Sequence, residues 1–425
     1  MMKQNLAPDW TKNSIIYEVN LRQFTPEGTF SAFEQHLPRL KKMGVDILWL
    51  MPIFPIGELN RKGTLGSYYA VKDYCAINPD YGTFDEFKNL VKKIHEIGMY
   101  VILDWVANHT AWDHIWVYNH PNRYSHDEFG NILAPNADWH DVAHLNYQSK
   151  DTRFAMTESL KFWISECDID GYRCDMAGLV TNDFWVEVRP ELEKLKNVFM
   201  LAEWEQVHIH DAFDMSYCWE LHHLMNHISR QHKNVYDLDH YRTYEINTFD
   251  TSYYRMLFTS NHDENSWQGS EYERMGDAAL TWAVFTYCMP GMPLIYSGQE
   301  SAVKKRLSFF EKDVINWDNY PLSEFYYKLN TLKKQNKALW NGLHGGAFTK
   351  IFTTNNDNIY AFIRNKGENK LICIFNFSPY NQQFKMENGF INGSFTNYFS
   401  NETLTLATKQ DITLHPWEYK VFICN

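Results

Sequence analysis

The stretch Gly171-Tyr172-Arg173-Cys174-Asp175-Met176-Ala177-Gly178 follows an apolar segment and places an arginine and a carboxylate two residues apart. Alternate residues of a β-strand point to the same face, so we expect Arg173 and Asp175 on one side of a strand end and Cys174 on the other. A neighbouring guanidinium lowers the pKa of a carboxyl group. This predicts an ionised Asp175 suited to nucleophilic attack or charge stabilisation. A structural ion pair at a strand end would explain the octapeptide alone equally well.

A second carboxylate has the same setting. The run Phe199-Met200-Leu201-Ala202-Glu203 is apolar and also ends in an acid. It follows the first run by about one strand-plus-helix repeat of an eightfold α/β barrel, which is roughly 30 residues. The spacing therefore predicts that Asp175 and Glu203 lie at the same end of adjacent parallel strands and face one opening.

The remaining pattern predicts a complete (β/α)8 TIM barrel. Strands and amphipathic helices alternate along the first three quarters of the chain, which indicates a parallel sheet. Besides the two acidic runs, the expected strands cover residues 14–20, 45–51, 100–104, 212–218, 255–260 and 293–297. The expected helices cover residues 30–43, 84–97, 151–167 and 322–336, and Phe154, Leu160, Trp163 and Ile164 are expected on the apolar side of the third.

The spacing from Asp104 to Asp175 exceeds one barrel repeat by roughly forty residues. We assign the excess to a short excursion over residues 110–145, whose composition is typical of loops. From residue 345 onward, short β-branched and aromatic runs alternate with Asn/Gly turns, which predicts an antiparallel β-sandwich. The expected domains are a catalytic barrel (1–109 and 146–344), the inserted excursion (110–145) and a C-terminal β domain (345–425).

Composition excludes several classes of partner. The formal net charge is −12, which argues against binding nucleic acid or an anionic membrane surface. No apolar run reaches the ~18 residues of a membrane-spanning helix, and residues 1–10 lack the apolar core of a signal peptide. We therefore expect a cytoplasmic protein, unless a signal has been removed; oligomeric state is left open.

Polar side chains gather at four of the predicted strand ends. They are Asp104, Asn108 and His109 after the third strand, Arg173 and Asp175 after the fourth, Glu203 after the fifth, and His262 and Asp263 after the seventh. Catalytic residues of TIM barrels lie at these carboxyl ends. Buried charge clusters are poor stabilisers, so their convergence predicts an active site.

The chain resembles the α-amylase family, family 13 of the glycoside hydrolases, and its bacterial members acting on maltodextrins. The resemblance rests on motifs that occur here in the family's order and extends over nearly the whole chain. They are 104–109 (DWVANH), 171–175 (GYRCD), 199–203 (FMLAE) and 260–263 (SNHD), flanked by 16–20 (IYEVN), 145–146 (LN) and 291–300 (GMPLIYSGQE).

The resemblance implies that Asp175 is the nucleophile, Glu203 the general acid and then base, and Asp263 a third carboxylate that holds sugar hydroxyls. It also implies an assisting set of residues around the sugar: Tyr69, His109, His262, Asp104 and Arg173, the last orienting Asp175. Trp204 is either a further sugar platform or a side chain packed against the barrel.

One departure from the family bears on metal binding. The family often has a Lys-His pair where this chain has Gly178 and Leu179, and the carbonyl of that histidine can hold calcium. We expect no cofactor for the chemistry. A structural calcium at Asn108 and Asp141 is an alternative that this departure argues against.

The motifs predict a retaining α-glucan hydrolase that cleaves α-1,4 bonds of maltodextrin or starch through a covalent glycosyl-enzyme. Such enzymes place the two carboxyl groups about 5–5.5 Å apart. A 4-α-glucanotransferase or glucosyl isomerase using the same intermediate is the alternative. A non-catalytic carbohydrate-binding protein on the same fold is a more remote one, because fold does not imply function.

Overall fold

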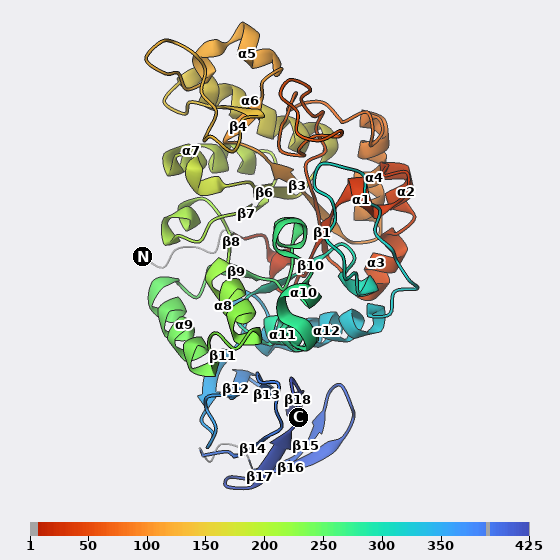
Figure 1. Cartoon of the computed structure of the whole chain (residues 1–425), viewed down its shortest axis with the longest axis vertical. Coiled ribbons are helices and arrows are strands. Elements are labelled where there is room, and N and C mark those ends of the chain that lie inside the picture. The colour runs from red at the N-terminus through yellow and green to blue at the C-terminus, as the bar shows by residue number, and fades with distance from the viewer. Residues whose placement is uncertain (1–6, 388–391, 425) are drawn as a thin grey trace.

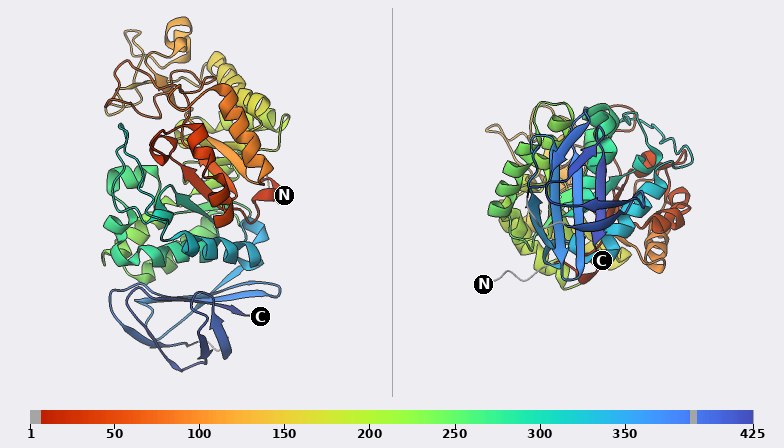
Figure 2. Two further views of the ribbon diagram at one scale, coloured as in Figure 1. Left: turned by 90° about the vertical axis from the view of Figure 1, so that its right-hand side faces the viewer. Right: turned by 90° about the horizontal axis from the view of Figure 1, so that it is seen from below.

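The computed structural model describes residues 7–387 and 392–424 of the 425-residue chain. Residues 1–6, within the segment expected to lack a signal peptide, lie outside that description. Along the long axis the molecule has three parts: the excursion at one end, the barrel in the middle and the C-terminal β domain at the other end (Figures 1 and 2).

A closed barrel of eight parallel strands forms the middle part, as the alternating pattern predicts. In spatial order its strands are β1 (Ile16–Val19), β10 (Met292–Tyr296), β9 (Tyr254–Leu257), β8 (Met215–Tyr217), β7 (Phe199–Ala202), β6 (Gly171–Cys174), β3 (Tyr100–Trp105) and β2 (Ile47–Leu50). The (β/α)8 fold is confirmed. Most strands are shorter than the predicted runs, whereas β3 extends one residue beyond its run, to Trp105.

The two faces of each strand serve different cores. Ile16, Ile47, Ile102 and Phe199 belong to a cluster inside the barrel, whereas their neighbours, such as Leu48, pack outward against the helices. Two residues further along several strands, the inward positions become polar and form the floor of the opening. They are Glu18, Asp104 and Arg173. The strand period of two thus stacks a polar layer on an apolar one.

Helices cover the outside of the barrel. The longer ones are α4 (Phe84–Glu96), α6 (Lys150–Cys167), α7 (Asn182–Glu193), α8 (Trp219–Ser229), α9 (Val235–Thr248), α11 (Ala279–Cys288) and α12 (Ser323–Gln335). Shorter ones are α1 (Leu21–Phe24), α2 (Phe30–Glu34), α3 (Leu37–Met43) and α10 (Glu271–Met275).

Two expectations about helices are wrong in detail. The helix expected over residues 30–43 is split into α2 and α3, because Pro38 lies in the first turn of α3, and its ring would clash with the carbonyl of Glu34 in an uninterrupted helix. Phe154 of α6 is 66% exposed, whereas Leu160 and Trp163 are buried. At 3.6 residues per turn, positions six apart lie on different faces of a helix.

The excursion after β3 is more regular than its composition suggests. It contains a two-stranded antiparallel pair, β4 (His109–Ala111) with β5 (Val142–His144), and the short helix α5 (Ile115–Asn119). The β4–β5 pair begins at His109, so the excursion starts from the rim of the barrel. It lies at the end of the molecule opposite the C-terminal β domain (Figure 1).

The C-terminal domain is an antiparallel β-sandwich, as predicted. A six-stranded sheet contains β11 (Ala347–Ile351), β12 (Ile359–Lys366), β13 (Asn369–Asn376), β18 (Tyr419–Cys424), β15 (Gly393–Asn397) and β16 (Thr403–Leu406). A two-stranded sheet, β14 (Gln382–Lys385) with β17 (Asp411–Leu414), closes over an apolar core that includes Ile374 and Ile412. Within the described residues, no helix is long and apolar enough to cross a membrane.

Candidate active site

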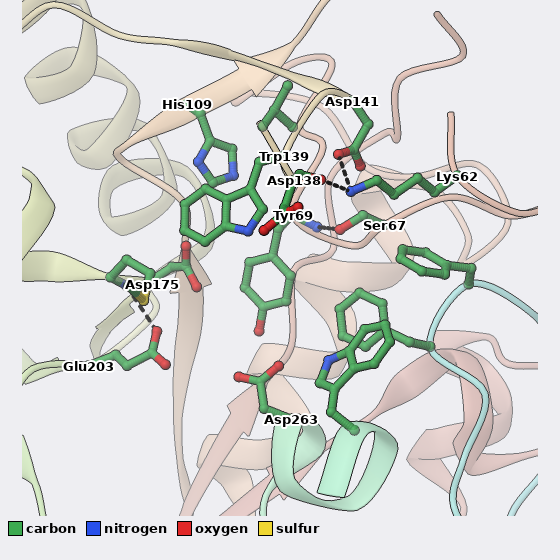
Figure 3. A pocket seen from close by; sticks show the side chains of 15 residues that line it. Lys62, Ser67, Tyr69, His109, Asp138, Trp139, Asp141, Asp175, Glu203 and Asp263 are labelled. Atoms are coloured by element: carbon green, nitrogen blue, oxygen red, sulfur yellow. Dashed lines mark hydrogen bonds and ion pairs between the residues drawn. The ribbon is translucent and has the colours of Figure 1, made fainter. Parts of the chain in front are cut away.

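A cavity of about 350 Å³ opens at the carboxyl ends of the barrel strands. Asp175 and Glu203 stand on one side of it, and Asp263 lies across from them, below the ring of Tyr69 (Figure 3). Its other lining residues are Lys62, Ser67, His109, Asp138, Trp139, Asp141, Val142, Met176, Trp267, Phe309 and Phe310. The three acids predicted from separate strand ends therefore share one cavity.

Arg173 joins the first two acids from below. Its Nη1 lies 3.1 Å from Oδ1 of Asp175, and its Nη2 lies 2.7 Å from Oε2 of Glu203. The Nη2 contact is an ion pair rather than an aligned hydrogen bond. Arg173 has no exposed surface. It therefore orients the carboxylates and is not placed to touch a substrate.

Asp104 has a similar position under the floor. It is fully buried and accepts from Nη1 of Arg173 at 2.8 Å, from the indole N–H of Trp49 at 3.1 Å and from the hydroxyl of Tyr69 at 3.0 Å. Its two oxygens thus fix both the arginine and the tyrosine. Like Arg173, it has no surface to offer a sugar, so we assign it a positioning role in place of the sugar contact expected from the sequence.

The backbone at the end of β6 positions the acid Glu203. Met176 adopts a left-handed conformation, with φ 41° and ψ 44°. For a residue other than glycine this conformation costs roughly 1–2 kcal/mol. In it, the Met176 N–H donates a 2.9 Å hydrogen bond to Oε2 of Glu203. Strained residues of this kind cluster at functional sites, and the sequence pattern gave no sign of this one.

His262 holds the third carboxylate. Its Nε2 lies 3.2 Å from Oδ2 of Asp263 and 2.7 Å from the Tyr69 hydroxyl, while Nδ1 contacts Glu18. Burial acts to lower the pKa of His262, but the charges of Asp263 and Glu18 outweigh it, and the pKa lies well above its usual value. A charged imidazolium can donate from both nitrogens, which matches these acceptors.

Glu18 belongs to the hydrogen-bonded network of the site, although the motif analysis quoted it without giving it a role. It is fully buried in β1 and pairs with His262. The signal was available: a carboxylate interrupts the otherwise apolar residues 15–19. Buried charges need a partner, so such an acid points to an ionic partner in the barrel.

Burial raises the pKa of Asp175 well above its ordinary value, Glu203 adds to the rise, and Arg173 lowers it only in part. The expectation that Arg173 holds this pKa down is therefore wrong in net direction. Burial also raises the pKa of Glu203, against the lowering effect of Arg173 and with a further rise from Asp263. At Asp263, His262 outweighs the effect of burial, and the pKa is lowered.

These shifts predict a bell-shaped dependence of kcat/KM on pH. Asp175 and Glu203 lie close enough to titrate as a pair. In the roles expected from the sequence, the reactive form carries one proton on Glu203 and a negative charge on Asp175. Activity should fall at acid pH as the pair takes up a second proton. It should fall again at higher pH, as the last proton leaves. This second fall should occur at the raised pKa of Glu203, which lies above its ordinary value of 4.5.

The measurement is kcat/KM against pH with a nitrophenyl maltooligosaccharide. With a substrate whose leaving group needs no protonation, Glu203→Gln should lose the alkaline limb of the pH profile, because glutamine has no proton to lose in this range. An alkaline limb that persists unchanged in this variant would contradict the assignment of Glu203 as the acid.

Two further predicted residues, His109 and Trp204, differ in their position relative to the cavity. His109 lines the cavity, and burial lowers its pKa to about 4, so it is neutral at pH 7. Trp204 is not among the lining residues. Its ring lies over Gly178, where a Cβ would come within 1.9 Å of Cε2 of the indole. Gly178 thus leaves room for Trp204 beside β6, and the structure places this tryptophan against the barrel.

The two residues considered for calcium are engaged elsewhere. The Asn108 amide lies 3.2 Å from Nδ1 of the adjacent His109, and Asp141 pairs with Lys62 at 3.0 Å. Among the residues that the structure describes, no group of three or more His, Cys, Asp or Glu side chains could hold a metal ion. Asp141 thus already has a cationic partner, and the calcium site considered from the sequence stays a prediction.

Comparison with known proteins places this arrangement in a family. The model of the alpha amylase catalytic domain matches residues 9–139 and 136–358, and that of the maltogenic amylase C-terminal domain matches residues 349–421. The chain belongs to the α-amylase family. The motifs at 104–109, 171–175, 199–203 and 260–263 thus indicated the correct family.

Several members of the α-amylase family are similar over long stretches. The alpha-amylase MalA of Haloarcula japonica is 28% identical over 327 residues, which cover 74% of this chain and 47% of MalA. The chain thus spans about half the length of that relative. The structure of a maltogenic alpha-amylase from Thermotoga neapolitana aligns over 99% of this chain and 100% of its own, with TM-score 0.90 and 28% identity. An alpha-amylase from Lactobacillus plantarum gives the same coverage, TM-score 0.89 and 29% identity.

Proposed function

We propose that this α-amylase family protein is a retaining α-glucan hydrolase acting on α-1,4 bonds of maltodextrins. The observation that carries the proposal is the pair Asp175 and Glu203, held on one buried guanidinium at a cavity wall, with Asp263 opposite. Glycoside hydrolysis needs two carboxyl groups in different protonation states, and a third can bind the sugar hydroxyls.

In the first step, the ionised Asp175 attacks the anomeric carbon while Glu203 gives its proton to the leaving glycosidic oxygen. In the second step Glu203 acts as a base. It takes a proton from water, the oxygen of that water attacks the anomeric carbon, and the bond from the sugar to Asp175 breaks. The positive charge that develops on the ring faces the carboxylates of Asp175 and Asp263.

Aromatic rings support an α-glucan as the substrate. Tyr69, Trp139, Trp267 and Phe309 line the cavity, and the Tyr69 and Phe309 rings are stacked, with centroids 6.3 Å apart. Flat apolar faces of this kind suit the apolar faces of sugar rings, while Asp263 and His109 offer polar groups to hydroxyls.

The test is the product profile from pure maltotriose, followed with time and repeated with a chelator present. We expect maltose and glucose in equal amounts and no dependence on the chelator, because Asp141 is paired with Lys62 and the chemistry uses carboxyl groups alone.

Oligosaccharides longer than maltotriose would instead indicate a glucanotransferase, since only transfer to a sugar acceptor lengthens the chain. Binding of maltotriose without any product would indicate the carbohydrate-binding alternative and contradict the proposal.

A further inference from the structure

The end of the cavity that lies away from Glu203 carries the ion pair between Lys62 and Asp141. Three segments meet there: the loop of residues 57–67 after β2, residues 138–142 of the excursion, and Phe309 and Phe310 after β10. In Figure 3, Lys62 and Asp141 stand at this end, with Tyr69 between them and the catalytic carboxylates.

Lys62 connects the first two segments. Its Nζ lies 3.0 Å from Oδ1 of Asp141 and donates to the carbonyl of Asp138 at 2.6 Å. The side chains of Lys62 and Asp141 are only 24% and 7% exposed. Both residues line the cavity, so their ion pair is part of its wall rather than an isolated surface contact.

The same loop is also fixed to the third segment. The Thr64 N–H donates to Oε1 of Glu311 at 2.9 Å, and the Leu65 N–H donates to the carbonyl of Phe310 at 3.1 Å. The side chain of Arg61 secures the loop to itself by donating from Nε to the carbonyl of Gly57 at 2.7 Å. The wall is therefore held on both sides of Lys62.

The proposed chemistry determines which end of the substrate lies toward Lys62. In a retaining displacement, the leaving group departs on the side of the acid Glu203, and the sugar that becomes bound to Asp175 extends the other way. The non-reducing portion of the substrate then runs past Tyr69 toward Lys62. This step rests on the proposed function.

We propose that the Lys62–Asp141 bridge ends the non-reducing side of the cavity, so that the enzyme acts on chain ends and releases glucose or maltose. A cavity of about 350 Å³ lies near the lower end of the ~300–1,000 Å³ range of small-molecule sites, which suits a short saccharide. An ammonium has three donors. Two are used on Asp141 and Asp138 within the described part of the chain, which leaves one for a hydroxyl of the terminal sugar.

The experiment compares maltoheptaose with maltoheptaose blocked at the 4- and 6-hydroxyls of its non-reducing end. The wild type should cleave the blocked substrate at least ten times more slowly than the free one. Lys62→Ala removes the bridge and should raise the blocked-to-free ratio of kcat/KM by ten-fold or more, because the blocked chain can then be cut at its internal bonds.

Lys72→Ala is the matched control. Lys72 joins the same loop to the same excursion through Glu58 at 3.0 Å and Asp113 at 3.2 Å, but it does not line the cavity. It should leave the ratio unchanged. Thermal unfolding of both variants shows whether either loses its fold. If Lys62→Ala does not fold, Lys62→Met replaces it, because methionine keeps most of the side-chain volume.

Equal cleavage of blocked and free substrate by the wild type would overturn the proposal while leaving the hydrolase assignment intact. A ratio that Lys62→Ala and Lys62→Met both leave unchanged would overturn the role of Lys62. Failure to cleave either substrate would overturn the proposed function itself.

Discussion

Replacement of Asp175 by asparagine is expected to lower kcat for maltooligosaccharides by roughly 10⁴–10⁶-fold, the range found when a catalytic nucleophile or its essential partner is removed. The amide keeps the shape of the carboxylate and cannot form the glycosyl-enzyme. The measurement is kcat and KM with maltotriose, using enzyme freed of wild-type contamination. A loss of less than ten-fold would contradict the assignment of Asp175 as the nucleophile.

The stability of Asp175→Asn separates a chemical loss from a folding loss. The folded-state pKa of Asp175 lies above its ordinary value, mainly through burial. Ionisation of Asp175 therefore costs the wild type stability as the pH rises through that raised pKa, and the amide has no such cost. The variant should be at least as stable as the wild type at pH 7, with the difference vanishing at acid pH.

Azide distinguishes the two carboxylates from each other. In Asp175→Ala, azide can enter the space of the nucleophile and displace the leaving group once, giving a product of inverted anomeric configuration. In Glu203→Ala, Asp175 still forms the glycosyl-enzyme from an activated substrate, and azide then displaces Asp175 with overall retention. The same anomer from both variants would contradict the assigned roles.

Arg173→Met is expected to reduce stability by about 3–5 kcal/mol, the cost of leaving buried charge without its partner. Arg173 has no exposed surface and contacts Asp104, Asp175 and Glu203. Its removal leaves three carboxylates in the barrel mouth without their common cation. Urea unfolding monitored at pH 7 measures the loss, and activity should fall with it because neither catalytic carboxyl is oriented.

Arg153→Met is the control for Arg173. Arg153 also pairs with two carboxylates, Asp183 and Glu187, but both are 63% exposed. Exposed pairs contribute about 0–1 kcal/mol. The deficit of Arg173→Met should shrink as the pH falls, since protonated carboxyl groups no longer need a cation. A deficit that is small and independent of pH would show that Arg173 is not the common counter-ion.

Sequence periodicity was sufficient for the barrel. Buried parallel strands need continuous apolar residues, and each repeat needs a helix to return the chain, so runs such as 45–51 and the spacing from Asp175 to Glu203 leave few other folds. The approximate positions of the three acids followed from the same spacing. The exposure of Phe154 and the break at Pro38 also follow from local rules, because helix periodicity sets residue 154 apart from residue 163 and a proline ring interrupts a helix.

What the sequence determined by itself is therefore the architecture and which acids stand at strand ends. Only the tertiary structure showed what surrounds these acids. Glu18 of β1 contacts His262, which follows β9, and the Met176 N–H donates to Glu203. Burial raises the pKa of Asp175 by more than Arg173 lowers it. The reason is physical. A strand's apolar period is encoded locally, whereas the pKa of a carboxyl group depends on desolvation and on charges brought together from distant parts of the chain.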